Sequence, residues 1–257
     1  MEILVCVKRV PATGGRITLT DDAQAIDTRF LGFTVSPHEE CAVEEAVRLV
    51  EAHGGTATVL TLGAEVATEQ LRDAVAIGAQ RAVLLETDGE ERDPAATAGA
   101  IVDAVRADAE AGRSYDVLLF GNEAADTGDY QVGIRVAHAL GLPCVAGIKG
   151  LEIAENRATA RREAASGGWE IFEVALPAVF TVKEGINLPR YPSVPGRLRA
   201  KKAEIERSRP APRDALLERI RLKLPPEEAS HVEMLGSGPE AAPAIVSVLQ
   251  RLGLVDR

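Results

Sequence analysis

Short apolar runs alternate with amphipathic runs through the first 141 residues of this 257-residue chain. The apolar runs have the length and character of buried strands, and the runs between them carry apolar residues at helical spacing. The predicted strands are 3–10, 56–63, 81–86 and 115–121, and the predicted helices are 36–55, 64–78, 93–112 and 129–141. Because this alternation is typical of right-handed βαβ crossovers, we expect an α/β fold with a doubly wound, mostly parallel, Rossmann-like sheet.

The predicted helix at 36–55 has the clearest boundaries. Ser36 is a candidate N-cap, Pro37 suits the first turn, and Glu39 completes the S-x-x-E pattern of a capping box. Gly54-Gly55 follows the last apolar residues and ends the helix. The sequence therefore predicts both ends of this helix from local signals.

The pattern changes after Leu142-Pro143. Residues 150–182 alternate around two turns, which predicts antiparallel strands added to the sheet. Residues 183–202 are rich in proline and lack periodicity, which predicts an extended, exposed segment. We expect a nucleotide-binding α/β domain over 1–200. Residues 201–257, with a short amphipathic stretch and a terminal helix, then form an arm that packs on another subunit.

Composition excludes several classes of protein. The net charge of −10 argues against binding nucleic acid through bulk charge. Cys6, Cys41 and Cys144 form no C-x-x-C pair, so neither a zinc ribbon nor a redox dithiol is indicated, and we expect Cys6 and Cys144 to be small buried hydrophobes. The N-terminus has no secretory pattern, and no apolar run reaches the roughly 18 residues of a membrane helix. We expect a cytoplasmic protein without a transmembrane segment.

The segment GNEAADTGDYQVG, residues 121–133, is the best candidate for a binding site. It follows a predicted strand and opens a predicted helix, and open parallel sheets bind ligands at the carboxyl ends of their strands. Gly121 permits a sharp turn. The backbone N–H groups of Gln131, Val132 and Gly133 fall in the first helical turn and suit a phosphate. Gly133 would also let the helix and a ligand approach closely.

Three carboxylates in this segment, Glu123, Asp126 and Asp129, disfavour a triphosphate. One of them can cap the helix and another can bind ribose hydroxyls, so a nucleotide with one or two phosphates is easier to accept. The alternative is a long surface loop in which an aspartate only caps the helix. The residues of the segment do not separate these two interpretations.

No catalytic constellation is present in the sequence. The chain lacks the P-loop pattern G-x-x-x-x-G-K-[ST], the G-x-G-x-x-G pattern and a nucleophile elbow. No two of its histidines have metal-ligand spacing; they are His38, His53, His138 and His231. The basic residues between 190 and 202 suit a solvated arm or a protein-docking loop better than a nucleic-acid site. We expect a chain that binds a ligand and presents it to a partner, rather than one that catalyses a reaction.

Several stretches resemble the beta subunit of electron transfer flavoproteins. The opening ILVCVKRVP is similar to the family's first strand and its K-x-V-P turn, and SPHEECAVEEAVRL is similar to its N-P-x-x-x-x-A-x-E-E-A helix. LRDAVAIGAQRAVLL resembles a further family segment. LPAVFTVKEGINLPRYPSVPGRLRAKK resembles the signature L-P-A-V-x-T-V-x-x-x-x-N-E-P-R-Y-P-S-L-P, which ends in A-K-K. The resemblance covers most of residues 1–205.

The resemblance implies that the 121–133 segment cradles the phosphate of an adenine nucleotide, which is AMP or, in electron-bifurcating members, a second FAD. Carried over by position, the cofactor-binding residues are Cys6, Ser36, Pro37, His38, Glu39, Leu62, Asn122, Glu123, Ala124, Ala125, Asp126, Thr127, Gly128, Asp129, Tyr130, Gln131, Val132 and Gly133. The residues implied in partner docking are Asn187, Leu188, Pro189, Arg190, Tyr191 and Pro192.

The resemblance also implies a heterodimer. Its alpha subunit holds most of the electron-carrying FAD, and this chain covers part of that flavin while its arm wraps alpha. The pair would carry electrons from acyl-CoA-type dehydrogenases to a quinone oxidoreductase, so the chain is an electron-carrier subunit rather than a classical enzyme. Exposed apolar residues on the arm argue against the alternative of a stand-alone nucleotide sensor of the same fold. The missing P-loop argues against a nucleotide-converting enzyme.

Three positions depart from the family pattern. Ser36 stands where the first-helix motif begins with asparagine, and a shorter side chain there suits helix capping better than contact with a base. Leu188 replaces the glutamate of the signature and removes a charge from the docking loop. Glu123 stands in place of glutamine in the 121–133 segment. These departures leave the choice between AMP and a second FAD open.

Overall fold

A computed structural model describes residues 1–12, 14, 17–226 and 233–255. They divide into two compact units, Met1–Leu222 and Lys223–Arg257. The first unit is built on one large sheet, and the second contains the short helix η2 (Gly238–Ala241) and the helix α6 (Ala242–Arg251). His231 lies outside the described residues.

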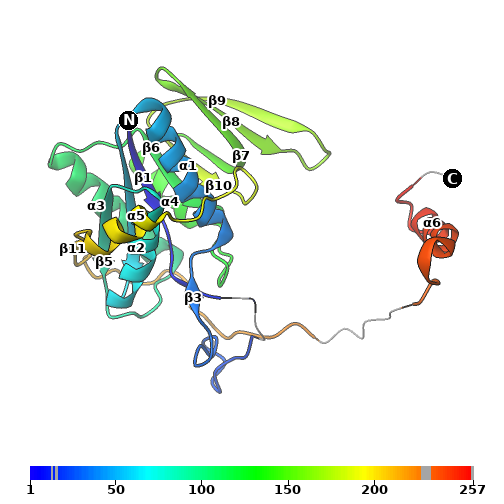
Figure 1. Ribbon diagram of the computed structural model, residues 1–257. Coiled ribbons are helices and arrows are strands. Elements are labelled where there is room, and N and C mark those ends of the chain that lie inside the picture. The colour runs from blue at the N-terminus through cyan, green and yellow to red at the C-terminus, as the bar shows by residue number, and fades with distance from the viewer. Residues whose placement is uncertain (13, 15–16, 227–232, 256–257) are drawn as a thin grey trace. The chain divides into compact units, whose positions relative to one another are not determined.

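The sheet of the first unit has nine strands in the order β11-β5-β4-β1-β6-β10-β7-β8-β9 (Figure 1). Neighbours from β11 to β7 run parallel, and β7, β8 and β9 form an antiparallel meander. The bounds are β1 Glu2–Cys6, β4 Thr56–Gly63, β5 Arg81–Glu86, β6 Val117–Gly121, β7 Cys144–Ala154, β8 Arg157–Glu163, β9 Trp169–Ala175, β10 Ala178–Val182 and β11 Glu206–Ser208. A separate antiparallel ribbon pairs β2 (Val10–Pro11) with β3 (Phe33–Thr34).

Helices cover both faces of the parallel part of the sheet (Figure 1). α1 (Pro37–His53), α2 (Thr68–Ile77) and α5 (Val194–Lys202) contribute to the core on one face, with the short helix η1 (Glu65–Ala67) leading into α2. α3 (Pro94–Glu110) and α4 (Val132–Leu140) contribute to the core on the other. Because the central strands are covered twice, they are continuous apolar runs, and Ile3 and Leu4 of β1 are both fully buried although they face opposite sides. The predicted doubly wound α/β class is confirmed.

The prediction that residues 150–182 only add antiparallel strands is wrong for its last part. β10 lies between β6 and β7, parallel to both, and all five of its residues are buried. A strand that is apolar on both faces needs cover on both faces, and the centre of the sheet offers it. The amino-terminal half of β7 pairs with β10, and its remainder begins the meander.

Two other predictions need correction. Residues 194–202, predicted to be extended, form α5; Ser193 caps this helix by accepting from the Gly196 N–H at 3.1 Å, and Pro195 lies in the first turn. Its periodicity was hidden because only Gly196 and Ala200 are buried. Cys144, predicted to be buried, is exposed at the start of β7.

The residues after α5 first rejoin the sheet. β11 adds a parallel strand beside β5, and Arg81 bonds Glu206 at 2.5 Å. Residues 213–222 then run without regular structure past the N-terminus of α3. There the carboxylate of the N-cap residue Asp93 accepts from the Leu216 and Leu217 N–H groups at 2.8 and 3.0 Å. In the second unit α6 has no buried residue. Packing of this arm on another subunit stays a prediction.

The close packing of α5 on α2 gives a test of the fold. A Cβ at Gly196 would overlap the carbonyl oxygen of Ala76 at the end of α2, so we expect Gly196→Ala to lower the free energy of unfolding by about 1–3 kcal/mol. Gly32→Ala is the control, because a Cβ at Gly32 meets nothing within 4 Å. Urea unfolding followed by circular dichroism measures both; equal stability of the two variants would contradict the described packing.

Candidate functional site

The strand order reverses between β1 and β6. From β1 the chain crosses to β4 and β5 on one side, while β6 lies on the other, and the carboxyl ends of β1 and β6 are neighbours. Ligands of doubly wound sheets bind at such a point. Residues 121–133, here called the nucleotide loop, leave the sheet from the end of β6 and lead into α4. The structure therefore places the predicted binding segment at the position where this fold forms a site.

The nucleotide loop is folded back on itself. The Asn122 N–H bonds the Val182 carbonyl at 2.9 Å, and the Asn122 side-chain oxygen accepts from the Thr181 hydroxyl at 2.8 Å. A turn is closed by the Gly128 N–H and the Ala124 carbonyl at 3.0 Å. Gly128 and Tyr130 have φ of 59° and 57°, a conformation that glycine adopts without strain. These bonds hold the loop beside the ends of β6 and β10.

The end of the loop forms the first turn of α4. Gln131 is the N-cap residue, and its side-chain oxygen accepts from Arg135 at 3.0 and 2.8 Å. The first backbone N–H groups of a helix have no partner within the helix. Gly133 was predicted to admit a ligand, but its position is explained by packing: a Cβ there would lie 2.9 Å from the Thr181 Cγ2 and 3.0 Å from the Phe120 ring. Gly133 thus lets α4 lie directly on the sheet.

The N-terminus of α1 packs against the same loop. A Cβ at Gly121 would lie 2.5 Å from the Glu39 Cγ, so only glycine permits this approach. The Ser36 hydroxyl donates to the Glu123 carbonyl at 3.4 Å, and the His38 Nε2 lies 3.2 Å from the Glu123 carboxylate. The Glu39 carboxylate accepts from the Ser36 N–H at 3.4 Å, as the predicted capping box requires. Four predicted site residues from two distant segments therefore meet here.

Lys8 is a site residue that the sequence analysis missed. It follows β1, and its ammonium group lies 2.8 Å from the Asp126 carboxylate and 3.0 Å from that of Glu91. Burial lowers the pKa of Lys8, but the two carboxylates outweigh burial and leave the pKa raised. The signal that could have revealed it is its place as the first charged residue after the first buried strand.

The other predicted site residues lie around this cluster. Cys6 is buried at the end of β1, where burial and the nearby Glu39 raise the pKa of its thiol. Leu62 is near the end of β4, the strand beside β1, and Pro37 is the first residue of α1. Asp129 and Tyr130 are exposed on the loop. The structure thus gathers the predicted residues at one end of the sheet.

Residues 183–192, here called the docking segment, contain two kinds of side chain. The Asn187 amide bonds the Glu45 carboxylate at 2.8 Å and the Cys41 carbonyl at 3.0 Å, and Arg190 bonds Glu44 at 2.9 Å. Leu188 and Tyr191 instead have 84% and 95% of their surface exposed. The predicted docking residues therefore divide into anchors on α1 and free apolar side chains.

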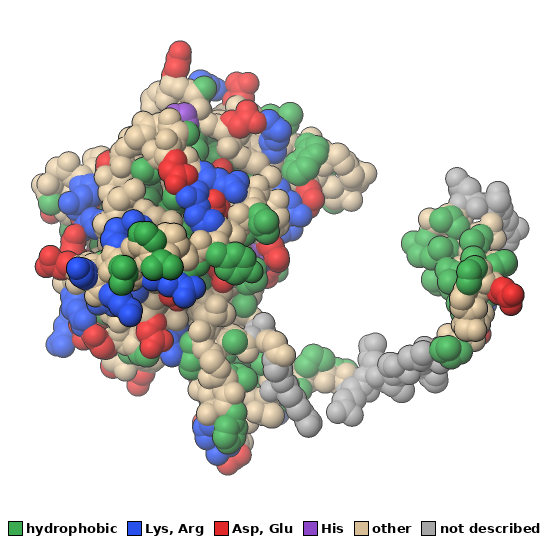
Figure 2. Space-filling model, viewed as in Figure 1, with side chains coloured by type: hydrophobic (Ala, Val, Ile, Leu, Met, Phe, Trp, Pro, Cys, Tyr) green, Lys and Arg blue, Asp and Glu red, His purple; other side chains and the backbone are tan. Residues whose placement is uncertain are grey.

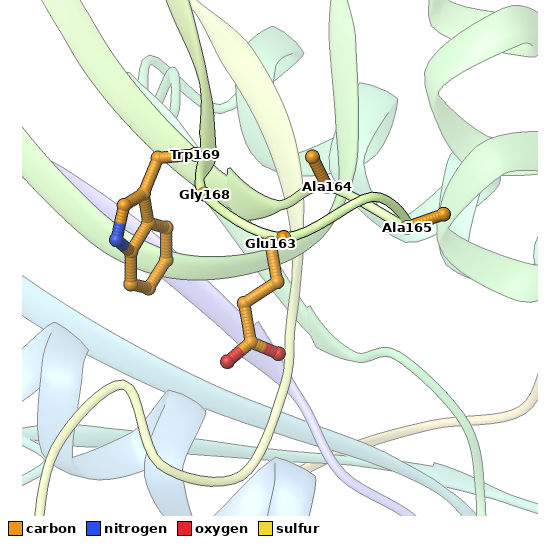
Figure 3. Close-up of a pocket in the computed structure, with 6 residues that line it drawn as sticks. Glu163, Ala164, Ala165, Gly168 and Trp169 are labelled. Atoms are coloured by element: carbon orange, nitrogen blue, oxygen red, sulfur yellow. The ribbon is translucent and has the colours of Figure 1, made fainter. Parts of the chain in front are cut away.

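Two hollows of the surface are lined by residues outside the nucleotide loop. Figure 3 shows one at the turn between β8 and β9, where the side chains of Glu163 and Trp169 stand beside the Ala164–Gly168 turn. The other lies between α3 and α4 and includes Ala98 and Ile134. Neither contains a predicted site residue. Among the described residues no group of three His, Cys, Asp or Glu side chains could hold a metal ion.

Burial of Glu39 predicts a pH-dependent stability. Burial raises the pKa of Glu39 from 4.5 to about 8. Hydrogen bonds from the Lys8 and Ser36 N–H groups lower this pKa, but burial outweighs them. Between those pH values the folded chain holds a proton that the unfolded chain has lost, so stability falls as the pH rises through this window. Glu39→Gln keeps an acceptor and removes the titration. We expect this variant to be more stable than the parent by about 1–3 kcal/mol at pH 9, and nearly equal at pH 5.

Urea unfolding at several pH values measures this difference. Glu110→Gln, at the exposed end of α3, is the matched control and should follow the parent at every pH. A constant offset between Glu39→Gln and the parent from pH 5 to pH 9 would contradict the prediction.

The sequence of this chain is similar to known proteins. A family model described as "Electron transfer flavoprotein domain" matches residues 26–212. The chain is 34% identical to the electron transfer flavoprotein subunit beta of Bacillus subtilis (strain 168), over 97% of this chain and 98% of the relative. It is 36% identical to the corresponding subunit of Syntrophomonas wolfei, over 91% of this chain and 90% of the relative.

Protein FixA of Rhizobium meliloti (strain 1021) is also similar, at 32% identity over 80% of this chain and 71% of the relative. No helix among the residues that the structure describes has the length and apolar character needed to cross a membrane. Because the family model spans most of the chain and relatives align along nearly all of it, the chain belongs to the electron transfer flavoprotein family, as a homologue of its beta subunits.

Proposed function

We propose that this chain is the beta subunit of a heterodimeric electron transfer flavoprotein and binds an adenine nucleotide at the nucleotide loop. The observation that carries the proposal is the position of this loop, at the reversal of strand order and in front of the first turn of α4. The N–H groups of that turn and the positive end of the helix dipole would hold a phosphate. The family relationship supports the same assignment.

The charges around the loop fit a nucleotide with one or two phosphates. Of the three carboxylates in the loop, Asp126 is paired with Lys8 and Glu123 lies beside His38. Asp129 is exposed and can accept hydrogen bonds from ribose hydroxyls. The Lys8 ammonium offsets the negative charge of Asp126 and so reduces its repulsion of a phosphate, while the other two carboxylates still disfavour a triphosphate. AMP and the diphosphate of a second FAD both meet this limit.

The redox group of the proposed heterodimer is an FAD bound mainly by the alpha subunit. When bound, the flavin supplies reversible electron transfer, and the protein supplies position and electrostatics. This chain covers part of the flavin and presents the docking segment to flavin dehydrogenases of the acyl-CoA type. The electrons then pass to a quinone oxidoreductase. The three cysteines of the chain are free, which fits a reducing compartment such as the cytoplasm.

The surface around α5 supports a docking role. Figure 2 shows hydrophobic side chains there, bordered by Lys and Arg side chains. Val194 and Leu198 of α5 are 73% and 56% exposed, and Arg199, Lys201 and Lys202 lie in its last turn. Apolar side chains surrounded by one sign of charge suit a partner whose surface is apolar at the centre and acidic at the rim. The exposed Leu188 and Tyr191 of the docking segment likewise favour a partnered subunit over a stand-alone sensor.

The test is to co-express the chain with its alpha subunit, denature the purified complex and identify every released nucleotide by mass and amount. AMP and FAD in equal amounts would assign AMP to the nucleotide loop. Two FAD and no AMP would assign a second flavin to it and make electron bifurcation the working mechanism. Release of no adenine nucleotide beyond one FAD would overturn the assignment of the loop.

A single charge at the cap of α4 tests the phosphate position. Gln131→Glu is nearly isosteric and keeps its partner Arg135, but it brings a negative charge to the first turn of α4. We expect it to weaken AMP binding by about tenfold, because the carboxylate repels a phosphate at this site.

Equilibrium dialysis with AMP measures the affinity. Gln80→Glu is the matched control, since the Gln80 side chain accepts from the Ala57 N–H near the start of β4, at the opposite end of the sheet from the loop. Equal AMP affinity of Gln131→Glu and the control would show that no phosphate sits at the first turn of α4.

A further inference from the structure

Among the side chains that the structure describes, His38 alone bonds both the nucleotide loop and the docking segment. Its Nε2 lies 3.2 Å from the Glu123 carboxylate of the loop. Its Nδ1 lies 2.8 Å from the Glu184 backbone nitrogen of the segment. Loop and segment are about 60 residues apart in the sequence, and the imidazole spans the space between them.

The two contacts fix the tautomer of the ring. A backbone N–H can only donate, so the Nδ1 must accept from Glu184 and carry no proton. The proton of the neutral imidazole is then on Nε2, where it donates to Glu123. Each bond therefore orients the ring for the other. A displacement of the Glu123 carboxylate would turn the ring and move the Nδ1 atom that accepts from the Glu184 N–H.

The hydrogen bond from Glu184 to His38 lies at the surface. The residue is exposed, and its N–H has the imidazole as its acceptor. Beyond it the segment is fixed along the flank of α1 by Asn187 and Arg190. The contacts of the segment with α1 at positions 38, 41 and 45 follow one face of the helix, with His38 at the end that touches the nucleotide loop.

We propose that His38 is a positioning residue that couples the nucleotide loop to the docking segment, so that whatever orders the loop also orders the start of the segment. In its ligand-dependent form the coupling rests on the proposed function: an adenine nucleotide that fixes Glu123 would fix the imidazole and with it Glu184. The loop is also joined to the end of β10, which leads into the segment. The Asn122 N–H bonds the Val182 carbonyl and the Asn122 side-chain oxygen accepts from the Thr181 hydroxyl, and neither bond involves His38.

The test uses amide hydrogen exchange of Glu184 in the full chain, followed by NMR. His38→Phe keeps a ring but removes both bonds, and we expect exchange of the Glu184 amide to rise about tenfold. His38→Asn places an oxygen near the Nδ1 position and should restore most of the protection, although it cannot reach Glu123. His53→Phe, at the exposed end of α1, is the matched control and should leave Glu184 unchanged.

A double-mutant cycle tests the coupling without any ligand. Glu123→Ala should raise exchange of the Glu184 amide about threefold in the parent and leave it unchanged in the His38→Asn background, because the imidazole is the link. An equal effect of Glu123→Ala in both backgrounds would overturn the proposal. So would an unchanged Glu184 amide in His38→Phe. The nitrogen chemical shifts of His38 in the parent should report the tautomer protonated at Nε2.

Added AMP separates this proposal from the proposed function. AMP that is bound to both proteins, as measured by equilibrium dialysis at a concentration that saturates each, and slows Glu184 exchange in the parent but not in His38→Asn supports both. AMP that binds without changing Glu184 exchange in the parent overturns the ligand-dependent coupling and leaves the nucleotide site standing. If AMP and FAD both fail to bind, the nucleotide assignment falls, and the cycle with Glu123→Ala still decides whether His38 couples the two regions.

Discussion

The approach of the α1 N-terminus to the end of β6 is the contact on which the candidate site depends. Gly121 has no Cβ, and the Glu39 side chain occupies the space that a Cβ would need. Because α1 lies this close, Ser36 and His38 reach the nucleotide loop directly. A larger residue at position 121 would push apart the two elements between which the site is formed. The close approach is therefore a condition for the site as well as a feature of the core.

α1 also carries buried carboxylates that hold the docking segment. Glu44 is almost fully buried, and the guanidinium groups of Arg190 and Arg48 outweigh the effect of burial and lower its pKa. Burial raises the pKa of Glu45, although the Asn187 amide bonds its carboxylate. Such groups stabilise a fold less than apolar residues of the same size would. They do fix one register of the docking segment on the helix, because a shifted segment would leave a buried carboxylate without its donor.

The sequence predicted the strands and helices whose signals are local. The alternation of the first 141 residues and the capping box at Ser36 and Glu39 were confirmed because strand periodicity and helix caps are written in neighbouring residues. The insertion of β10 between β6 and β7 depends on pairing with strands that are distant in the sequence. α5 was missed because the residues that it buries, Gly196 and Ala200, are small and give no large apolar face toward the core. Lys8 was missed because its partners, Asp126 and Glu91, are distant in sequence.

The proposed nucleotide would have a physical role in this arrangement even without a catalytic group beside it. A ligand that binds only the folded chain stabilises it in proportion to the logarithm of its concentration over its Kd. The proposed ligand would touch the nucleotide loop, which is bonded to α1 through Ser36 and His38. The same helix anchors the docking segment at Glu44 and Glu45. Stabilisation gained at the loop would therefore reach the segment through α1, so a bound AMP would support partner docking without taking part in electron transfer.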